Sequence, residues 1–186
     1  MKNSMLKKRT MFFILLSIFF IVMVILRNRS DELPNLDPEF PAVTGKNLQG
    51  KQFVFPRDFR SARVLIIFGY EREQAALLSS WVIGLDLANR DWEWYEMPVI
   101  SAPLILGSWF IDGGMRKGIP DIRLQERVIT LYTDREKFSN SLGIPFNIQG
   151  VYAVVVDQKG KLLGYIQGGY TVEGAQQIER WMKTPK

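Results

Sequence analysis

The sequence contains neither cysteine nor histidine among its 186 residues. Without cysteine it forms no disulfide, no thiolate nucleophile and no thiolate metal site. Without histidine it has no Ser-His-Asp triad, no histidine-bound zinc or haem, and no side chain whose ordinary pKa lies near neutrality. Catalysis would have to rest on carboxylates, lysine, tyrosine, serine or threonine. We therefore predict no catalytic residue, no metal site and no cofactor.

Acidic residues are absent from the first 30 positions, and this uneven charge accounts for the formal net charge of +5. Six basic residues lie in that stretch: Lys2, Lys7, Lys8, Arg9, Arg27 and Arg29. From residue 30 onward, 18 basic residues face all 19 acidic ones, a net charge of −1. Because the excess of positive charge belongs to the N-terminus, we predict no nucleic-acid partner.

Residues 10–26 (TMFFILLSIFFIVMVIL) form an uncharged apolar run at the lower end of the length that spans a bilayer as a helix. The sequence RNRSDELP follows, without the small-residue cleavage site of a signal peptide. This favours an uncleaved signal-anchor helix in residues 1–29 over a cleaved signal peptide. Four basic residues precede the run and two follow it, which places the N-terminus in the cytoplasm. We expect a single-pass protein of the inner or cytoplasmic membrane, with an extracytoplasmic (periplasmic) domain.

Residues 30–41 (SDELPNLDPEFP) combine three prolines with acidic residues and show no apolar period. Such a composition is typical of a short, stiff tether. The folded domain is therefore predicted to occupy residues 42–186.

The pattern within this domain alternates between strands and helices. A hairpin with glycines about its turn is expected first, then strands and helices in the order strand 63–70, helix 73–89, strand 92–100, helix 102–120, strand 127–132, helix 135–143, strand 151–156, strand 161–166 and a helix opened by Thr171. Pro98 predicts an edge position or an early end for its strand. The pair Gly113-Gly114 predicts a break in its helix. The order indicates an α/β three-layer sandwich of thioredoxin-like plan, preceded by one transmembrane helix.

The positions that carry redox chemistry in a thioredoxin-like fold hold other residues here. With Phe68 as the reference for register, the Cys-x-x-Cys pair falls near Glu73 and Ala76, and neither residue forms a thiolate. The usual cis-proline position falls near Val151, and a cis bond is costly at a residue other than proline. These three are degenerate redox-site positions.

Four segments together resemble the mitochondrial F-type ATP synthase assembly factors, which are chaperones for the membrane-embedded subunit a. They are FPAVTGKNLQGK, the SSW at Ser79 to Trp81, FIDGGMRKGIP, and YAVVVDQKGKLLGYIQGGYTVEGAQQIERW. The resemblance covers most of the chain after residue 39. It implies a non-catalytic thioredoxin-like fold that works by binding a hydrophobic partner. In contrast to that family, this chain carries its own predicted membrane anchor.

The most distinctive segment of the resemblance is also a candidate partner-binding loop. Its residues are Trp109, Phe110, Gly113, Gly114, Met115, Arg116 and Lys117. Glycine, methionine and cations beside large aromatic residues make an adaptable, partly basic surface. The alternative is a solvated loop that caps a core helix. Arg116 and Lys117, with Arg123 and Arg127, are candidates to bind an anionic lipid or an acidic client, or else form an ordinary solvated surface.

These features lead to one functional hypothesis and two alternatives. We expect a membrane-anchored, non-enzymatic assembly factor or chaperone for a membrane protein complex, with ATP synthase as the candidate complex. Its partners would be an integral membrane client and, through residues 10–26, the lipid bilayer. The alternatives are a thiol-independent, peroxidase-like enzyme that uses a bound metal or cofactor, and a permanent accessory subunit of a membrane complex.

Overall fold

A computed structural model describes residues 37–101 and 108–183, with the side chains of residues 108–112 excluded. The chain from Asp37 to Lys186 is one compact unit. The predicted transmembrane segment, residues 10–26, lies outside the described residues. Within the described part, no helix combines the length and the apolar composition needed to cross a bilayer.

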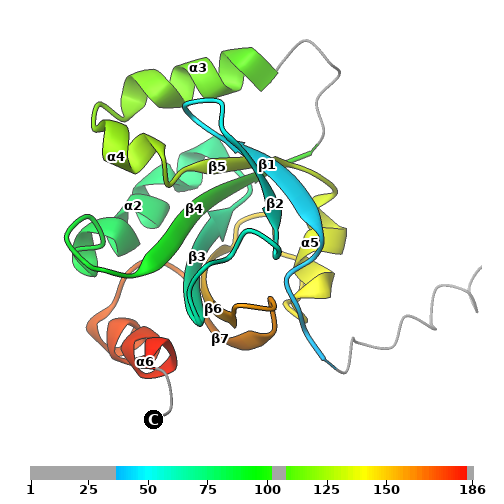
Figure 1. The fold of residues 1–186 in the computed structure, drawn as a ribbon, viewed down its shortest axis with the longest axis vertical. Helices are drawn as coiled ribbons and strands as arrows, with labels where there is room; N and C mark the ends of the chain where they lie inside the picture. Colours follow the sequence, from blue (N-terminus) through cyan, green and yellow to red (C-terminus); the bar gives the residue numbers. More distant parts are fainter. Residues whose placement is uncertain (1–36, 102–107, 184–186) are drawn as a thin grey trace, which may run out of the picture. The chain divides into compact units, whose positions relative to one another are not determined.

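The described residues build a seven-stranded mixed sheet in the order β2-β1-β5-β4-β3-β6-β7 (Figure 1). Strands β3, β4 and β5 are parallel, whereas β1 with β2, β1 with β5, β3 with β6, and β6 with β7 are antiparallel. The strands are β1 (Val43–Asn47), β2 (Gln52–Phe55), β3 (Arg63–Gly69), β4 (Glu93–Ile100), β5 (Ile129–Tyr132), β6 (Val151–Asp157) and β7 (Leu162–Gln167).

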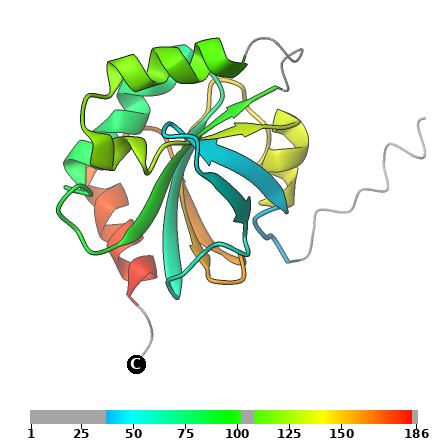
Figure 2. The same ribbon diagram turned by 45° about the horizontal axis from the view of Figure 1, so that its top comes forward.

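Helices cover both faces of this sheet. They are η1 (Arg72–Gln74), α2 (Ala75–Gly84), α3 (Ser108–Gly118), α4 (Ile122–Gln125), α5 (Arg135–Ser141) and α6 (Val172–Met182). Trp81 of α2 and Ile178 of α6 pack into one apolar core, and Phe138 of α5 packs into the core on the other face. Figure 2 shows α5 and α6 on opposite sides of the sheet. The predicted three-layer α/β architecture is therefore confirmed.

The core on the α5 face is rich in aromatic rings and begins earlier in the chain than the sequence indicated. Phe40 is 2% exposed, and its ring meets those of Phe55, Phe59 and Phe138 edge-on at centroid distances of 6.0, 5.5 and 5.4 Å. The Phe40 N–H also donates to the carbonyl of Gly160 at 2.7 Å. The folded unit thus includes residues 37–41, which the composition had assigned to the tether.

The position of Pro98 differs from the prediction. Strand β4 is not an edge strand, because it lies between β3 and β5, and it continues past Pro98 to Ile100. Pairing with β5 is interrupted opposite this proline, between the Glu96–Val128 bridge and the Val99–Leu131 pair. A central strand tolerates proline here because the missing N–H falls in a gap of the ladder.

The predicted break at Gly113-Gly114 is also wrong. Helix α3 runs through both glycines and ends at Gly118, two residues before Pro120. Glycine weakens a helix interior by about 1 kcal/mol relative to alanine, but it does not forbid the helix. The segment is therefore a helix with a basic last turn, and not an irregular loop.

Strand β4 carries an acidic residue in a poorly solvated position. Glu96 lies two residues after Trp94, on the same face of the strand. Burial raises the pKa of its carboxyl from 4.5 to about 7. The carboxyl receives no hydrogen bond or ion pair from the described residues. The folded state therefore retains the proton on Glu96 at a pH where the unfolded chain has lost it.

This titration predicts a pH-dependent stability. The free energy of unfolding should decrease as the pH rises from about 4.5 to about 7, because the folded pKa lies above the unfolded one. Glu96→Gln should remove this dependence and be more stable than the wild type at pH 8 by about 1–3 kcal/mol. Urea unfolding of both proteins between pH 4 and pH 8 measures the difference. Parallel curves for the two proteins would contradict the assignment.

The packing of Phe40 gives a second prediction. Phe40→Ala should lower the free energy of unfolding by about 3–5 kcal/mol, because it removes a fully buried ring. The exposed Lys46 on β1 is a matched control, since Lys46→Ala should change stability by less than about 0.5 kcal/mol. Urea unfolding followed by tryptophan fluorescence measures both. Equal effects would show that residues 37–41 are not part of the cooperative unit.

Candidate partner-binding site

The candidate site lies at the carboxyl end of β3, where the chain passes through Tyr70 and Glu71 into η1 and α2. Glu73 in η1 and Ala76 in the first turn of α2 are both exposed at this end of the sheet. Val151 opens β6, is 1% exposed and pairs with Gly69 of β3. Among the described residues the cis peptide bond is Phe55–Pro56, so the bond before Val151 is trans. The three predicted positions therefore lie on adjacent segments.

Gln74 joins these segments through its side-chain amide. The side chain is buried, and its Oε1 accepts from the backbone N–H of Tyr70 at 2.7 Å and of Glu71 at 3.0 Å. Its Nε2 donates to the carbonyl of Ile148 at 2.8 Å. We call these three hydrogen bonds the Gln74 bridge. It ties the start of α2 to the loop before β6 and satisfies three backbone groups that helix and sheet leave unpaired.

The approach of Gln74 to the strand requires glycine at position 69. A Cβ atom on Gly69 would lie 2.6 Å from the Oε1 atom of Gln74. A larger residue would push the amide away from the backbone groups it bonds. Glycine at the end of β3 therefore leaves the space that the Gln74 side chain occupies.

Arg135, at the start of α5, fixes the same turn from the other side. Its guanidinium donates to Glu71 Oε1 at 2.8 Å, to the carbonyl of Tyr70 at 2.7 Å and to the carbonyl of Val99 at 3.2 Å. The Arg135 side chain is 19% exposed, so this pair is better shielded than a surface ion pair. One arginine therefore links the ends of β3 and β4 to α5.

Tyr70 is the buried phenol of the site. Its hydroxyl donates to Ser139 Oγ at 3.0 Å, and the Phe146 ring lies edge-on to it at 5.3 Å. Burial raises the pKa of Tyr70 to about 12. The phenol therefore stays protonated at physiological pH and acts as a packing and hydrogen-bonding group rather than as a base.

A third segment, the turn after β7, completes the site. The Gly168 N–H donates to the carbonyl of Val151 at 2.7 Å, and the Trp81 indole donates to the carbonyl of Gly168 at 2.8 Å. The N–H of Tyr170 donates to Ser80 Oγ at 2.9 Å. Gly168 has a positive φ of 104°, a conformation that favours glycine. Hydrogen bonds therefore join the start of α2, the loop before β6 and this turn.

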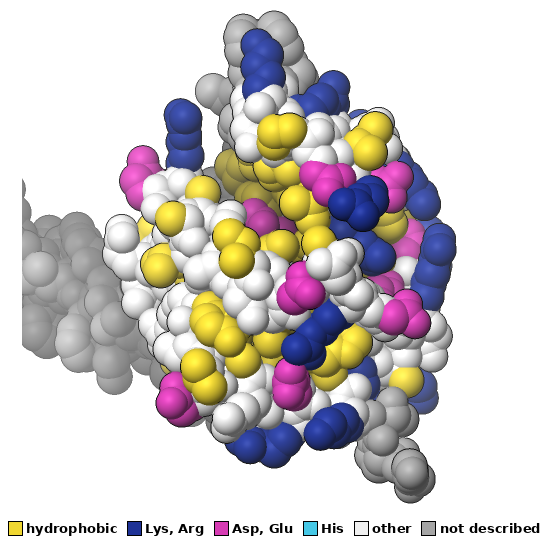
Figure 3. Space-filling model, turned by 90° about the vertical axis from the view of Figure 1, so that its left-hand side faces the viewer, with side chains coloured by type: hydrophobic (Ala, Val, Ile, Leu, Met, Phe, Trp, Pro, Cys, Tyr) yellow, Lys and Arg dark blue, Asp and Glu magenta, His cyan; other side chains and the backbone are white. Residues whose placement is uncertain are grey.

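Helix α2 presents an uncharged surface to solvent beside these segments. It contains no charged residue over its length, AALLSSWVIG. Leu77 is 46% exposed and Ile83 is 77% exposed. We call the exposed residues of this helix the α2 surface: Ala75, Ala76, Leu77, Ser79, Ile83 and Gly84. Figure 3 shows mostly yellow and white atoms on the left of the molecule, whereas most charged side chains lie on the right and along the lower edge.

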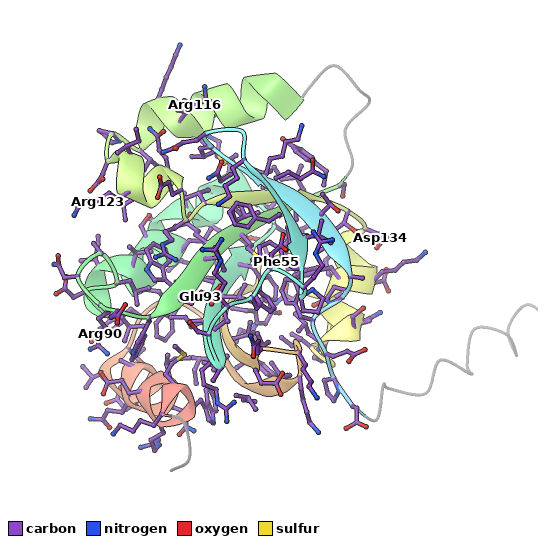
Figure 4. All side chains as sticks on the ribbon, in the orientation of Figure 1. Phe55, Arg90, Glu93, Arg116, Arg123 and Asp134 are labelled. Carbon is purple, nitrogen blue, oxygen red and sulfur yellow. The ribbon has the colours of Figure 1, made fainter. Side chains whose placement is uncertain are left out.

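The residues of the predicted partner-binding loop are only partly described. Gly113, Gly114, Met115, Arg116 and Lys117 lie in α3, whereas the side chains of Trp109 and Phe110 lie outside the described set. Arg116 donates through Nε to the carbonyl of Leu48 at 2.6 Å, so it pins α3 to the turn between β1 and β2 (Figure 4). Lys117 is exposed.

The other two basic candidates already have interactions within the chain. Arg123 pairs with Asp121 at 2.8 Å on the surface, and the Arg127 guanidinium lies 5.9 Å from the centroid of the Trp94 ring. Three of the four basic candidates, Arg116, Arg123 and Arg127, therefore contact groups of the chain itself, whereas Lys117 is exposed.

Sequence reasoning missed Gln74 and Arg135, which organise the site. A buried glutamine that follows two exposed charged residues fits no apolar period, and the partners of Arg135 are far away in the chain. One local signal was available. Glu71 and Gln74 have the spacing of a capping box, in which residues three apart bond reciprocally at a helix start.

The Gln74 bridge predicts a large loss of stability on substitution of Gln74 and almost none on substitution of the adjacent Glu73. Gln74→Ala should lower the free energy of unfolding by about 2–4 kcal/mol, because it leaves two N–H groups and one carbonyl without partners. Glu73→Ala, on the exposed side of the same turn, should change it by less than about 0.5 kcal/mol. Chemical denaturation measures both values. Similar losses at the two positions would refute the bridge.

The sequence matches no protein-family model, and no curated protein is significantly similar to it. Solved structures do resemble the fold. A candidate electron transfer protein from Aquifex aeolicus has a TM-score of 0.59 at 12% identity, over 80% of this chain and 96% of its own. BsSco, a member of the Sco family of cytochrome c oxidase assembly proteins, has a TM-score of 0.55 at 15% identity, over 78% of this chain and 92% of its own. The lipoprotein thioredoxin Etrx1 of Streptococcus pneumoniae has a TM-score of 0.51 at 17% identity, over 75% of this chain and 98% of its own. At these identities the comparisons establish the fold alone, and that fold is thioredoxin-like.

Proposed function

We propose that the chain is a non-enzymatic assembly factor or chaperone that binds an apolar segment of an integral membrane protein. The observation that carries this proposal is the α2 surface, which is exposed, uncharged and held beside a rigid site without thiols. The proposal keeps residues 10–26 as a membrane anchor and places the domain on the extracytoplasmic side of the membrane.

The chemistry of the α2 surface suits an apolar helix. A partner that covers this surface buries Leu77 and Ile83 without removing water from any charged group of α2. Alanine, serine and glycine on the same surface allow the backbone of a partner helix to approach closely. An anchored domain would meet such a segment at a high effective concentration.

A redox or copper-carrying role fits the residues less well. Thiol exchange needs thiolates, and copper sites in proteins use chiefly cysteine, histidine and methionine. The sequence has no cysteine or histidine, and the described residues contain no cluster of three or more acidic side chains that would hold a metal ion. BsSco belongs to a family of cytochrome c oxidase assembly proteins, and that assembly role supports the proposal by analogy of fold.

The resemblance to ATP synthase assembly factors suggests the client. Within the proposed function, the membrane-embedded subunit of an ATP synthase is the first protein to test. A permanent accessory subunit would use the same surface but would remain in the mature complex at constant stoichiometry.

Site-specific crosslinking in native membranes tests this function. A benzophenone amino acid in place of Ile83 should crosslink to an apolar segment of an integral membrane protein, identified by mass spectrometry. The same amino acid in place of Gln158, in the exposed turn between β6 and β7, is the control and should give no such product. Soluble products alone, or equal products from both positions, would contradict the proposal.

A charge on the α2 surface gives an independent measurement. Ile83→Asp should reduce recovery of the client by about tenfold or more, because the complex would bury an unpaired carboxylate. Lys46→Asp, on β1, is a control with an added carboxylate and should leave recovery unchanged. Circular dichroism of the purified variants checks that both remain folded. Unchanged recovery with Ile83→Asp would exclude the α2 surface as the binding surface.

The α3 surface is tested separately through Lys117. Loss of Arg116 would also break its hydrogen bond to Leu48, so Lys117→Ala is the cleaner variant. If the basic end of α3 also contacts the client, Lys117→Ala should lower recovery by about two- to fivefold, the effect of one rim charge. Unchanged recovery would restrict the interface to α2 and its neighbours.

A further inference from the structure

A second surface feature lies at the opposite end of the sheet from the candidate site. The loops that lead into β2, β3, β4 and β5 meet there and enclose a cleft of about 390 Å³. A smaller hollow of about 270 Å³ shares Lys51, Phe53 and Arg60 with it. The cleft has the size of small-molecule sites in proteins, which begin at roughly 300 Å³.

The floor of the cleft is fixed by Glu93. Its Oε2 accepts from the backbone N–H of Arg60 at 2.9 Å and of Ser61 at 2.6 Å, and its Oε1 accepts from the Tyr95 hydroxyl at 2.9 Å. Burial and the neighbouring Glu93 raise the pKa of Tyr95 above its ordinary value, so the phenol stays a donor. The charge of Glu93 is therefore compensated by three donors, and it holds the loop before β3 in place (Figure 4).

Three cations face this cleft without a carboxylate partner. Lys51, Arg60 and Arg127 line it, and within the described part of the chain none of them forms an ion pair. The nearby Arg57 and Arg90 differ, since they pair with Asp58 and Glu179. Lys51 lies 5.1 Å from the Phe53 ring centroid, which leaves its ammonium available to a ligand.

Two carboxylates line the same cleft. Asp91 and Glu126 are exposed and form no ion pair with the described cations. The carboxylate of Glu93 already accepts three hydrogen bonds. The charged groups available to a ligand are therefore the three cations and the two carboxylates named above. A simple anion would meet the two carboxylates as well as the cations. A ligand that carries both signs would use both sets.

We propose that this cleft binds a small zwitterion in which a phosphate is joined by a short chain to an ammonium group, the chemistry of phosphoethanolamine. Arg60 and Arg127 would bind the phosphate through their planar guanidinium groups, with Lys51 as a third cation. Asp91 and Glu126 would accept from the ammonium, and Trp92 would cover the connecting carbons. This chemistry occurs in free phosphoethanolamine and in the headgroup of phosphatidylethanolamine.

Titration calorimetry of the full chain in non-ionic detergent tests the proposal. Phosphoethanolamine should bind at one site, and inorganic phosphate should bind about tenfold more weakly, because it lacks the ammonium. Arg60→Gln and Arg127→Gln should each weaken phosphoethanolamine binding by about tenfold. Asp91→Asn should weaken phosphoethanolamine but not phosphate. Arg123→Gln, whose guanidinium pairs with Asp121 outside the cleft, is the control and should change nothing.

Two further measurements make the result decisive. Lys51 is exposed, so Lys51→Gln should fold and provides a cleft variant if circular dichroism shows that either arginine variant is unfolded. Dihexanoyl-phosphatidylethanolamine distinguishes the source: tighter binding than phosphoethanolamine supports a lipid, and weaker binding supports a free metabolite. Absence of binding by both, equal affinity for inorganic phosphate, or binding unaffected by the cleft variants would overturn the proposal. None of these results depends on the α2 surface.

Discussion

The side-chain amide of Gln74 is the interaction on which the candidate site depends. It bonds to backbone groups on two segments that meet only in the folded protein, the turn after β3 and the loop before β6. Such groups would otherwise be buried without partners, at a cost of about 1–3 kcal/mol each. Arg135 supports the same turn through Glu71 and Tyr70. The direction in which α2 leaves the sheet, and hence the placement of its uncharged surface, follows from these contacts.

The two ends of the parallel strands differ in chemistry. At the carboxyl end, Gln74 and Arg135 bond to the backbone groups of the turn after β3, and α2 presents an uncharged surface to solvent beside this turn. At the amino end, Glu93 is compensated by three donors while nearby cations remain without carboxylate partners. A thioredoxin-like fold without thiols thus presents an apolar surface at one end and a charged cleft at the other. Binding at each end requires a different kind of molecule.

Much of the fold could be predicted because its strands are strongly marked. The runs that form β3 and β6 are buried on both faces, so their sequences are continuously apolar. Asp134 and Thr171 cap α5 and α6 as expected from their side chains. The errors arose where tertiary contacts overrode local preference. Pro98 is tolerated by a gap in pairing with β5, and Phe40 is recruited into the core from a proline-rich segment.

The sequence located the degenerate redox-site positions but not the contacts around them. Register on the apolar run of β3 placed Glu73 and Ala76, and the pattern of the second half of the fold placed Val151, on segments that are adjacent in the structure. Neither could show that the glutamine between the first two faces inward, because a buried amide has no periodic signature in sequence. The same limit applies to the cleft, whose residues come from four loops that the topology alone brings together.

Native-state hydrogen exchange at the backbone amides of Tyr70 and Glu71 tests the central claim most directly, because both amides donate to Gln74. If the Gln74 bridge makes the site rigid, these amides should exchange only through global unfolding, at rates comparable to those of the amides in β3 and β6. Exchange faster by about a thousandfold, through local opening, would contradict a rigid site.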